Sequence, residues 1–255
     1  MSDSTQDGFV KSEIKNGVGN ITFFHPSHNA LPSPLLRLLV EEIDKLGADP
    51  SVKVIVLESG GNRTFCAGAS FDELISIQDH DTGKAFFMGF ANVINAIRKC
   101  PKLIIGKVQG KAVGGGVGIA SAVDYCLATK YASIKLSELA IGIGPFVIEP
   151  AVTRKIGLSA MSQLSINPTA WKSADWALNQ GLYAQVLESQ EELNTHALQF
   201  AKELATYNPE AQQQLKKVLW SGTEQWDELL ARRAEISGNL VLSDFTKDAL
   251  ARFGK

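Results

Sequence analysis

The sequence predicts an α/β fold in which parallel strands are joined by crossover helices. Short runs rich in valine and isoleucine, such as Val52 to Leu57 and Leu103 to Val108, alternate with glycine-containing loops and helical patterns. This order is typical of parallel strands. From Ser189 onward the pattern becomes almost purely helical. We therefore expect a core over residues 1–188 and a helical C-terminal region over residues 189–255.

Local signals predict the first elements of the chain. Alternating apolar residues in Phe9 to Ile14 and in Val18 to Phe24 flank Asn16-Gly17, a pair suited to the positive φ angles of a two-residue turn. We expect a β-hairpin there. Ser33-Pro34 supplies a helix cap and a first-turn proline, and the helix that follows is expected to end at Gly47.

Further strands and helices alternate along the rest of the chain. The core continues with a loop from Ser59 to Ser70, a helical pattern from Asp72 to about Lys99, glycines at 110 to 118 and a strand from Asp124 to Thr129. The C-terminal helical region carries Trp220, Trp226 and Phe245. Such large apolar side chains exceed what short helices bury alone, so we expect this region to pack on the core and on other subunits.

Composition and charge exclude several classes of protein. The 255 residues are 45% hydrophobic and 20% charged, which is enough apolar surface for a large core and excludes intrinsic disorder. A net charge of -2 provides no excess of positive charge to bind nucleic acid. Uncharged apolar stretches such as Ala112 to Val123 and Leu139 to Ile148 are too short to cross a bilayer, and the polar N-terminus does not resemble a secretion signal. We expect a cytoplasmic protein with no nucleic-acid or membrane partner.

The cysteines and histidines form no reactive pattern. Cys66, Cys100 and Cys126 are odd in number and widely spaced, which fits neither a disulfide framework nor a metal site. No Gly-x-Ser-x-Gly element occurs, and the four histidines lie in loop or surface-like contexts. We therefore expect neither a metal site nor a serine nucleophile.

Two loops between a strand and a helix could carry chemistry. They span Arg63 to Phe71 and Gly110 to Gly118, and both place small residues at a helix N-terminus. The first backbone N–H groups of a helix lack intrahelical partners and favour negative charge, so the two loops could together bind one oxyanion. Close packing of helix on sheet explains the glycines equally well. Nucleotide-binding patterns fail, because Ala112 follows Gly110-Lys111 and Ile119 replaces the third glycine of a dinucleotide motif.

Two carboxyl groups bracket an otherwise uncharged segment. Glu138 and Glu149 enclose ten uncharged residues. Burial among such residues would raise the pKa of a carboxyl toward neutrality, which suits a group that must take and return a proton. Either glutamate could instead cap a helix or pair with Lys135 or Arg154.

Several motifs in order resemble the crotonase, or enoyl-CoA hydratase/isomerase, superfamily. They are Phe65-Cys-Ala-Gly-Ala69, Gly110 through Gly118 with Asp124 after it, Glu138 after a short strand, Ala177-Leu-Asn-Gln-Gly181-Leu182, and Ser243 through Phe253. The resemblance covers about Phe9 to Lys255. It implies a spiral of repeated ββα units followed by a C-terminal helical region that builds trimers, often paired into hexamers.

The resemblance also implies an acyl-CoA thioester as substrate, with coenzyme A as part of the substrate and no separate cofactor. The thioester oxygen would accept hydrogen bonds from the N–H groups of Ala69 and Gly115, and Glu138 would move the proton. Further substrate contacts are implied at a set of matching positions: Asn29, Ala30, Leu31, Ala67, Ser70, Phe71 and Gly114. Lys216, Lys217 or Lys255 could reach the CoA phosphates.

One departure from the family pattern bears on the reaction. Family hydratases use two glutamates, and the first of these positions is Gly118 here. Moving a double bond needs a single acid/base group, whereas hydration asks for two. Glu138 alone therefore favours isomerisation of a 3-enoyl-CoA to a 2-enoyl-CoA. Hydration remains an alternative if Glu149 faces the pocket, and a non-catalytic acyl-CoA-binding protein is the other.

Overall fold

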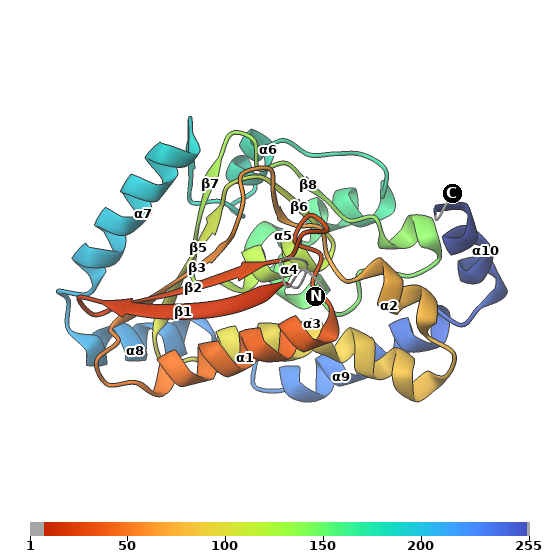
Figure 1. Cartoon of the computed structure of the whole chain (residues 1–255), viewed down its shortest axis with the longest axis horizontal. Coiled ribbons are helices and arrows are strands. Elements are labelled where there is room, and N and C mark those ends of the chain that lie inside the picture. The colour runs from red at the N-terminus through yellow and green to blue at the C-terminus, as the bar shows by residue number, and fades with distance from the viewer. Residues whose placement is uncertain (1–7, 254–255) are drawn as a thin grey trace, which may run out of the picture.

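Two sheets form the centre of the molecule (Figure 1), and after the first hairpin each successive pair of strands adds one strand to each sheet. The computed structural model describes residues 8–253. The larger sheet has the strand order β1 (Phe9–Lys15), β2 (Val18–Phe24), β3 (Val54–Ser59), β5 (Leu103–Val108), β7 (Tyr125–Thr129) and β9 (Gln185–Leu187). The smaller has the order β4 (Thr64–Cys66), β6 (Lys111–Val113) and β8 (Ile134–Lys135). Apart from the β1–β2 hairpin, neighbouring strands are parallel.

Helices follow each pair of strands and complete the repeat. They are α1 (Ser33–Ala48), α2 (Phe71–Ser76), α3 (His80–Lys99), α4 (Gly115–Ala122), the 3-10 helix η1 (Glu138–Ile141), α5 (Glu149–Ile166), α6 (Ala174–Asn179), α7 (Gln190–Leu204), α8 (Pro209–Leu219), α9 (Trp226–Leu240) and α10 (Asp244–Phe253). The strands β3, β5 and β7 each add to the larger sheet, and the strand after each adds to the smaller one. The ββα spiral expected from the sequence is confirmed.

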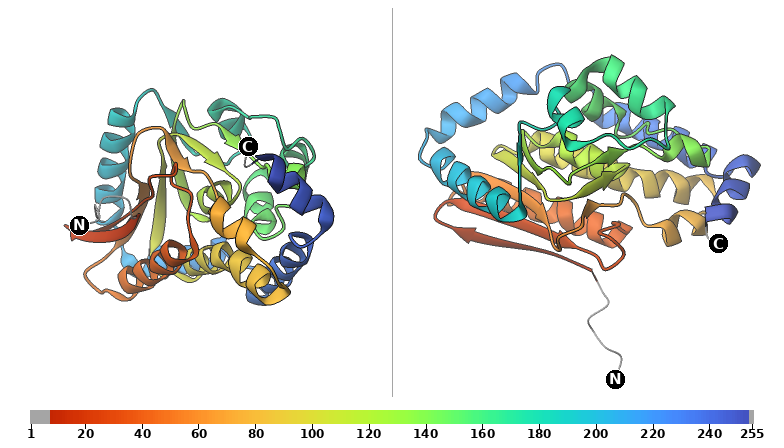
Figure 2. Two further views of the ribbon diagram at one scale, coloured as in Figure 1. Left: turned by 45° about the vertical axis from the view of Figure 1, so that its right-hand side comes forward. Right: turned by 90° about the horizontal axis from the view of Figure 1, so that it is seen from above.

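The central strand β3 of the larger sheet is buried on both faces. Val54 and Val56 of β3 pack with Leu193 of α7, whereas the alternate residues Ile55 and Leu57 point into the main core with α1 and α3. The helices α7 and α1 lie on opposite sides of the strands (Figures 1 and 2). Because successive strand side chains face opposite ways, a strand covered on both faces must be apolar at every position. This explains the continuous valine and isoleucine runs.

Three local expectations need correction. Ser33 does not cap α1, because Pro32 occupies the N-cap and the Ser33 hydroxyl donates to Glu73 at 2.7 Å. The helical pattern from 72 to 99 forms two helices, since the Asp79 side chain accepts from Thr82 N–H and starts α3 anew. The expected loop from 59 to 70 contains β4, which is too short to show alternation.

The C-terminal helices are fixed to the core by one buried acid. The Asp124 carboxylate lies 2.8 Å from Lys216 Nζ and accepts from Trp220 Nε1 at 2.8 Å, both from the end of α8. The same carboxylate accepts from Ile104 N–H on β5. Because these partners join three distant segments, the helical region packs on the core as the sequence predicts.

Glycines allow α9 to cross α3 with the two backbones in contact. A Cβ atom on Gly83 of α3 would lie 2.8 Å from the carbonyl oxygen of Gly238, and one on Gly238 would lie 2.6 Å from the amide nitrogen of Lys84. Only residues without side chains permit this approach. The crossing therefore fixes which residues of α9 face the core.

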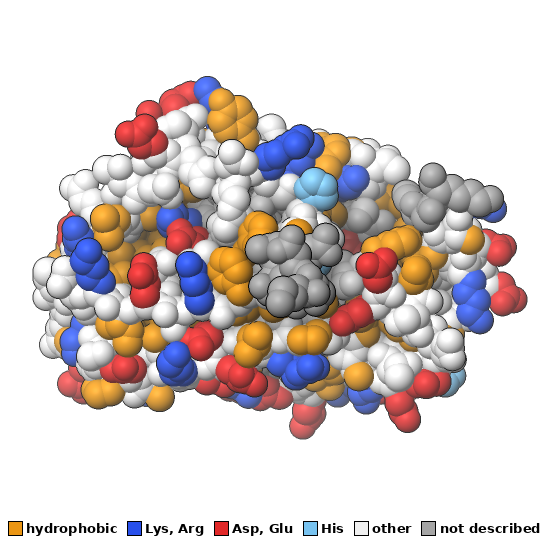
Figure 3. Space-filling model, viewed as in Figure 1, with side chains coloured by type: hydrophobic (Ala, Val, Ile, Leu, Met, Phe, Trp, Pro, Cys, Tyr) orange, Lys and Arg blue, Asp and Glu red, His pale blue; other side chains and the backbone are white. Residues whose placement is uncertain are grey.

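Apolar and charged side chains are mixed over the surface. Trp220 and Trp226 are buried against each other in an edge-to-face pair with ring centroids 5.7 Å apart, whereas Phe245 is 68% exposed. Acidic and basic groups are interspersed on the face shown in Figure 3. Exposed apolar side chains such as Phe245 are available for contacts with other subunits. Such contacts stay a prediction.

Replacement of Gly83 by alanine is expected to lower the free energy of unfolding by about 1–3 kcal/mol, because the methyl group would meet the backbone of α9. Chemical denaturation measures this change. The matched control is Lys84→Ala on the same helix, which removes an exposed ion pair with Glu235 and should cost about 1 kcal/mol at most. Equal losses in both variants would contradict the importance of the backbone contact.

Candidate active site

The loop after β4 lies directly against the loop after β6. Gly68 has a φ of +93°, which glycine adopts without strain, and its carbonyl accepts from Leu31 N–H at 2.8 Å. A Cβ atom on Gly68 would lie 3.2 Å from the carbonyl oxygen of Val113 and 3.7 Å from the amide nitrogen of Gly115. The two loops therefore meet, backbone to backbone, beside the start of α4.

The glycines of the second loop have separate tasks. Gly114 has a φ of +52°, and its N–H donates to the carbonyl of Lys135 at 3.0 Å. A Cβ atom on Gly116 would lie 2.5 Å from the carbonyl oxygen of Cys66, so this glycine does serve close packing of helix on strand. Gly115, between them, is the first residue of α4. Both explanations of the cluster from the sequence thus apply, at different positions.

The N–H groups of Ala69 and Gly115 are available to a ligand. Within residues 8–253, neither N–H has a hydrogen-bond acceptor. Both residues line the same cavity. The Gly115 N–H also stands at the N-terminus of α4, where the helix dipole favours negative charge. Such a pair of donors can stabilise an oxygen on which negative charge develops.

Glu138 brings one carboxyl group to this cavity. It begins η1, directly after β8, and its Oε1 would lie 2.9 Å from a Cβ atom on Gly114. Glu138 lines the cavity, and its Oε2 is shielded from solvent and has no hydrogen-bond partner among the described residues. Burial raises the pKa of Glu138 to about 7. The group can therefore be either a proton acceptor or a proton donor near neutral pH.

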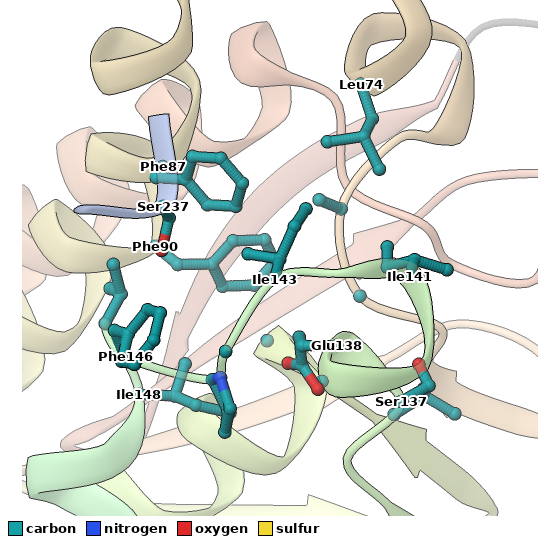
Figure 4. A pocket seen from close by; sticks show the side chains of 18 of the residues that line it. Leu74, Phe87, Phe90, Ser137, Glu138, Ile141, Ile143, Phe146, Ile148 and Ser237 are labelled. Atoms are coloured by element: carbon teal, nitrogen blue, oxygen red, sulfur yellow. The ribbon is translucent and has the colours of Figure 1, made fainter. Parts of the chain in front are cut away.

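The cavity is small and mostly apolar (Figure 4). Its volume is about 230 Å³, which is less than the roughly 300–1,000 Å³ of sites that enclose a whole drug-sized ligand. Five aromatic rings contribute to the wall, those of Phe71, Phe86, Phe87, Phe90 and Phe146. Such a cavity suits the acyl end of a ligand whose polar remainder stays outside.

The position of the missing family glutamate has no room for a side chain. A Cβ atom on Gly118 would overlap the side chain of Ile148, which itself lines the cavity. An apolar group therefore occupies the space that a second carboxylate would need.

Glu149 lies outside the cavity lining. Its carboxylate accepts a hydrogen bond from the Thr153 hydroxyl at 2.7 Å and lies 3.5 Å from Arg233 of α9. These contacts fit the alternative in which this glutamate pairs with an arginine, although the partner is Arg233 and not Arg154. The structure does not bring Glu149 together with Glu138 in one cavity.

Among the other predicted substrate contacts, the segment from Asn29 to Leu31 supports the first loop. The buried Asn29 side chain donates to the carbonyls of Gly60 and Thr64 at 2.9 and 2.8 Å. Ala30 follows it, and Leu31 is fully buried and pairs with Ala69 in an isolated β-bridge. None of the three lines the cavity.

The remaining residues of the first loop divide between the cavity and the helix cap. Ala67 and Phe71 line the cavity, as Gly114 does from the second loop. The Ser70 hydroxyl instead accepts from Glu73 N–H at 3.3 Å and caps α2. Ser70 thus fixes where the first loop ends and α2 begins.

The predicted lysine contacts with CoA are not at the cavity. Lys216 is only 3% exposed, and its ammonium is held by Asp124 and by the carbonyl of Lys102. Its neighbour Lys217 lies near the same end of α8. Lys255 lies outside the described residues.

The structure adds residues that sequence reasoning did not single out. Phe146 and Ile148 face the cavity from the segment between η1 and α5, and Ser237 reaches it from α9. The sequence run Phe86, Phe87, Met88 and Phe90 fits a pocket wall and a helix buried against the sheet equally well. In the structure the three phenylalanines line the cavity, and Met88 packs against the main core. No local signal marks Ser237, since its position depends on how α9 crosses α3.

The fold and the paired loops define an α/β protein of the ββα-spiral class. The sequence pattern of the Enoyl-CoA hydratase/isomerase family matches residues 13–250, so the chain belongs to this family. It is 30% identical to the short-chain-enoyl-CoA hydratase of Clostridium acetobutylicum over 94% of this chain and 92% of that protein. It is 27% identical to human ethylmalonyl-CoA decarboxylase over 99% of this chain and 89% of that protein.

Solved structures share the fold. An enoyl-CoA hydratase from Bacillus halodurans superposes with a TM-score of 0.88 and 24% identity, over 95% of this chain and 99% of that one.

Among residues 8–253, we find no helix with the length and apolarity that a membrane crossing requires.

The raised pKa of Glu138 predicts a pH-dependent cost in stability. Below pH 4.5 the Glu138 carboxyl is protonated in both the folded and the unfolded chain, so its burial does not lower the free energy of unfolding. That stability is lost as the pH rises through about 7, because the unfolded chain ionises the carboxyl more readily than the folded one. A shift of this size corresponds to about 3 kcal/mol. We therefore expect Glu138→Gln to be more stable than the wild type at pH 8 but not at pH 4, by chemical denaturation. A stability difference that does not change with pH would contradict the raised pKa.

Proposed function

We propose that the protein stabilises the enolate of an acyl-CoA thioester and isomerises a 3-enoyl-CoA to a 2-enoyl-CoA. The observation that carries this proposal is one carboxyl group, with a pKa near 7, beside two unbonded backbone N–H groups in an apolar cavity. The N–H groups of Ala69 and Gly115 would hold the thioester oxygen. Glu138 would be the acid/base group.

The reaction needs no co-reactant. The Glu138 carboxylate removes a proton from C2, which lies between the thioester and the double bond, and the electron pair moves toward the thioester oxygen. The protonated Glu138 then returns the proton to C4 as the double bond forms between C2 and C3. Each N–H donor could stabilise the charged oxygen by about 3 kcal/mol in the transition state. A pKa near 7 suits both proton transfers because neither form of the carboxyl is strongly preferred.

Hydration is less well supported by the cavity. Ile148 fills the space at Gly118, and Glu149 is engaged by Thr153 and Arg233. A water molecule would therefore have Glu138 as its only carboxyl partner in the described lining. Hydratase activity with Glu138 and Glu149 remains the alternative, and the 30% identity to a hydratase supports it.

Decarboxylation is a second candidate because of the relatives named ethylmalonyl-CoA decarboxylase. Loss of CO₂ from a 2-carboxyacyl-CoA leaves the same enolate on the thioester. The protonated form of Glu138 could then deliver a proton to C2. An apolar cavity also favours the loss of a carboxylate, which is poorly solvated there.

We extend the proposal to the cofactor, the oligomeric state and the location of the protein. Coenzyme A would enter as part of the substrate, and we propose no separate cofactor. The exposed apolar side chains of the C-terminal helices, Phe245 among them, would form contacts in a homotrimer or a dimer of trimers. We propose a cytoplasmic location.

Purified protein is expected to convert 3-enoyl-CoA to 2-enoyl-CoA without adding water, and Glu138→Gln should lower turnover at least about 100-fold because it removes the proton carrier. Chromatography of the products measures both outcomes, with 2-enoyl-CoA and 2-carboxyacyl-CoA substrates assayed in parallel.

The matched control is Glu149→Gln, which should change turnover less than about threefold if Glu149 remains outside the cavity. Water addition that depends on Glu149 would favour the hydratase, and release of CO₂ the decarboxylase. Binding of acyl-CoA with no exchange of its C2 protons in deuterated water would favour a non-catalytic protein.

A further inference from the structure

Besides the Glu138 carboxyl, a second polar group in the described residues of the cavity wall has no partner. The Ser237 side chain is 1% exposed and lines the cavity from α9. Within residues 8–253, its Oγ makes no hydrogen bond. A buried hydroxyl without a partner is unfavourable, and such groups are rare in folded proteins. This one therefore needs an explanation.

Other serines in helices of this chain satisfy themselves locally. The hydroxyls of Ser121, Ser162 and Ser165 each donate to the backbone carbonyl four residues earlier, at 2.8–2.9 Å. This bond is the ordinary choice of a helical serine. Ser237 has an equivalent carbonyl at Arg233 and makes no bond to it. Its hydroxyl is therefore buried and unpaired within the described residues, in a residue that lines the cavity.

The crossing of α9 over α3 places Ser237 in the wall. Gly238 contacts Gly83 backbone to backbone, so the residue before Gly238 is held close to α3. Phe87 and Phe90 lie four and seven residues after Gly83, on the same face of α3. Figure 4 shows Ser237 beside these two rings, on the opposite side of the cavity from Ser137.

Ser237 would face the tail of an acyl group whose thioester oxygen is held at Gly115. The Phe90 ring covers Gly115, since a Cβ atom on Gly115 would overlap that ring. The Phe90 ring thus contacts Gly115, and Ser237 lies beside the same ring (Figure 4). An acyl chain whose oxygen is held at Gly115 would pass Phe90 before it reaches the Ser237 hydroxyl.

We propose that Ser237 is a specificity-determining residue that donates a hydrogen bond to an uncharged oxygen in the acyl tail, such as a ketone, ether or hydroxyl. The inference rests on the proposed use of acyl-CoA thioesters and adds the class of acyl group. An uncharged oxygen fits because the described lining contains no lysine or arginine, and an unpaired carboxylate would be costly to bury. A plain hydrocarbon tail would leave the hydroxyl unsatisfied.

Calorimetric titration with paired saturated acyl-CoAs tests the proposal without requiring turnover. In each pair, of short, medium or long chain, one tail carries a ketone and the other a methyl branch in its place. We expect the wild type to bind one ketone about tenfold or more tightly than its hydrocarbon counterpart. Ser237→Ala should abolish this preference, and Ser237→Cys, of similar volume but a weaker donor, should reduce it.

Ser121→Ala is the matched control, because it removes an equally buried helical hydroxyl that is already bonded. It should keep the wild-type preference. Thermal unfolding confirms that each variant is folded. Binding without any ketone preference in the wild type, or a preference that survives in Ser237→Ala, would overturn the role of Ser237 alone. Failure to bind any acyl-CoA would overturn both this inference and the proposed function.

Discussion

Backbone contact between two loops is the constraint on which the site depends. Gly68, whose φ of +93° favours glycine, lies against Val113 and Gly115, and Gly116 lies so close to Cys66 that a side chain would clash. The contact brings Ala69 and Gly115, whose N–H groups have no acceptor within residues 8–253, to one cavity and puts Gly114 beside the Glu138 carboxyl. Charge that develops on a ligand oxygen would meet fixed donors, so little reorganisation would be needed during reaction.

The apolar lining of the cavity determines the proton affinity of the Glu138 carboxyl. Burial raises the pKa of Glu138 to about 7, and Ile148 keeps a second carboxylate from the Gly118 side. Burial of this ionisable carboxyl lowers the stability of the fold. It also gives a group that exchanges protons readily near neutral pH. The C-terminal region takes part as well, because α9 adds Ser237 to the wall. A region expected to build the oligomer thus also shapes the cavity.

Features set by neighbours in the sequence could be predicted, and those set by distant packing could not. Asn16-Gly17 predicts the hairpin because its turn is local, and small residues after a strand mark both loops. Glu138 was identified by its uncharged surroundings and its resemblance to the family pattern. The burial of Lys216 depends on its ion pair with Asp124, far away in the sequence, so no local pattern could predict it. Ser237 depends on a helix crossing that no local pattern encodes.

Infrared spectroscopy of a bound acyl-CoA labelled with ¹³C at the thioester carbonyl tests the central claim most directly. If the N–H groups of Ala69 and Gly115 hold the thioester oxygen, the carbonyl bond is polarised and weakened. We expect its stretching frequency to fall below the value in water. A frequency equal to or above that in water would show that the two loops do not bind this oxygen, and would contradict an enolate-stabilising site.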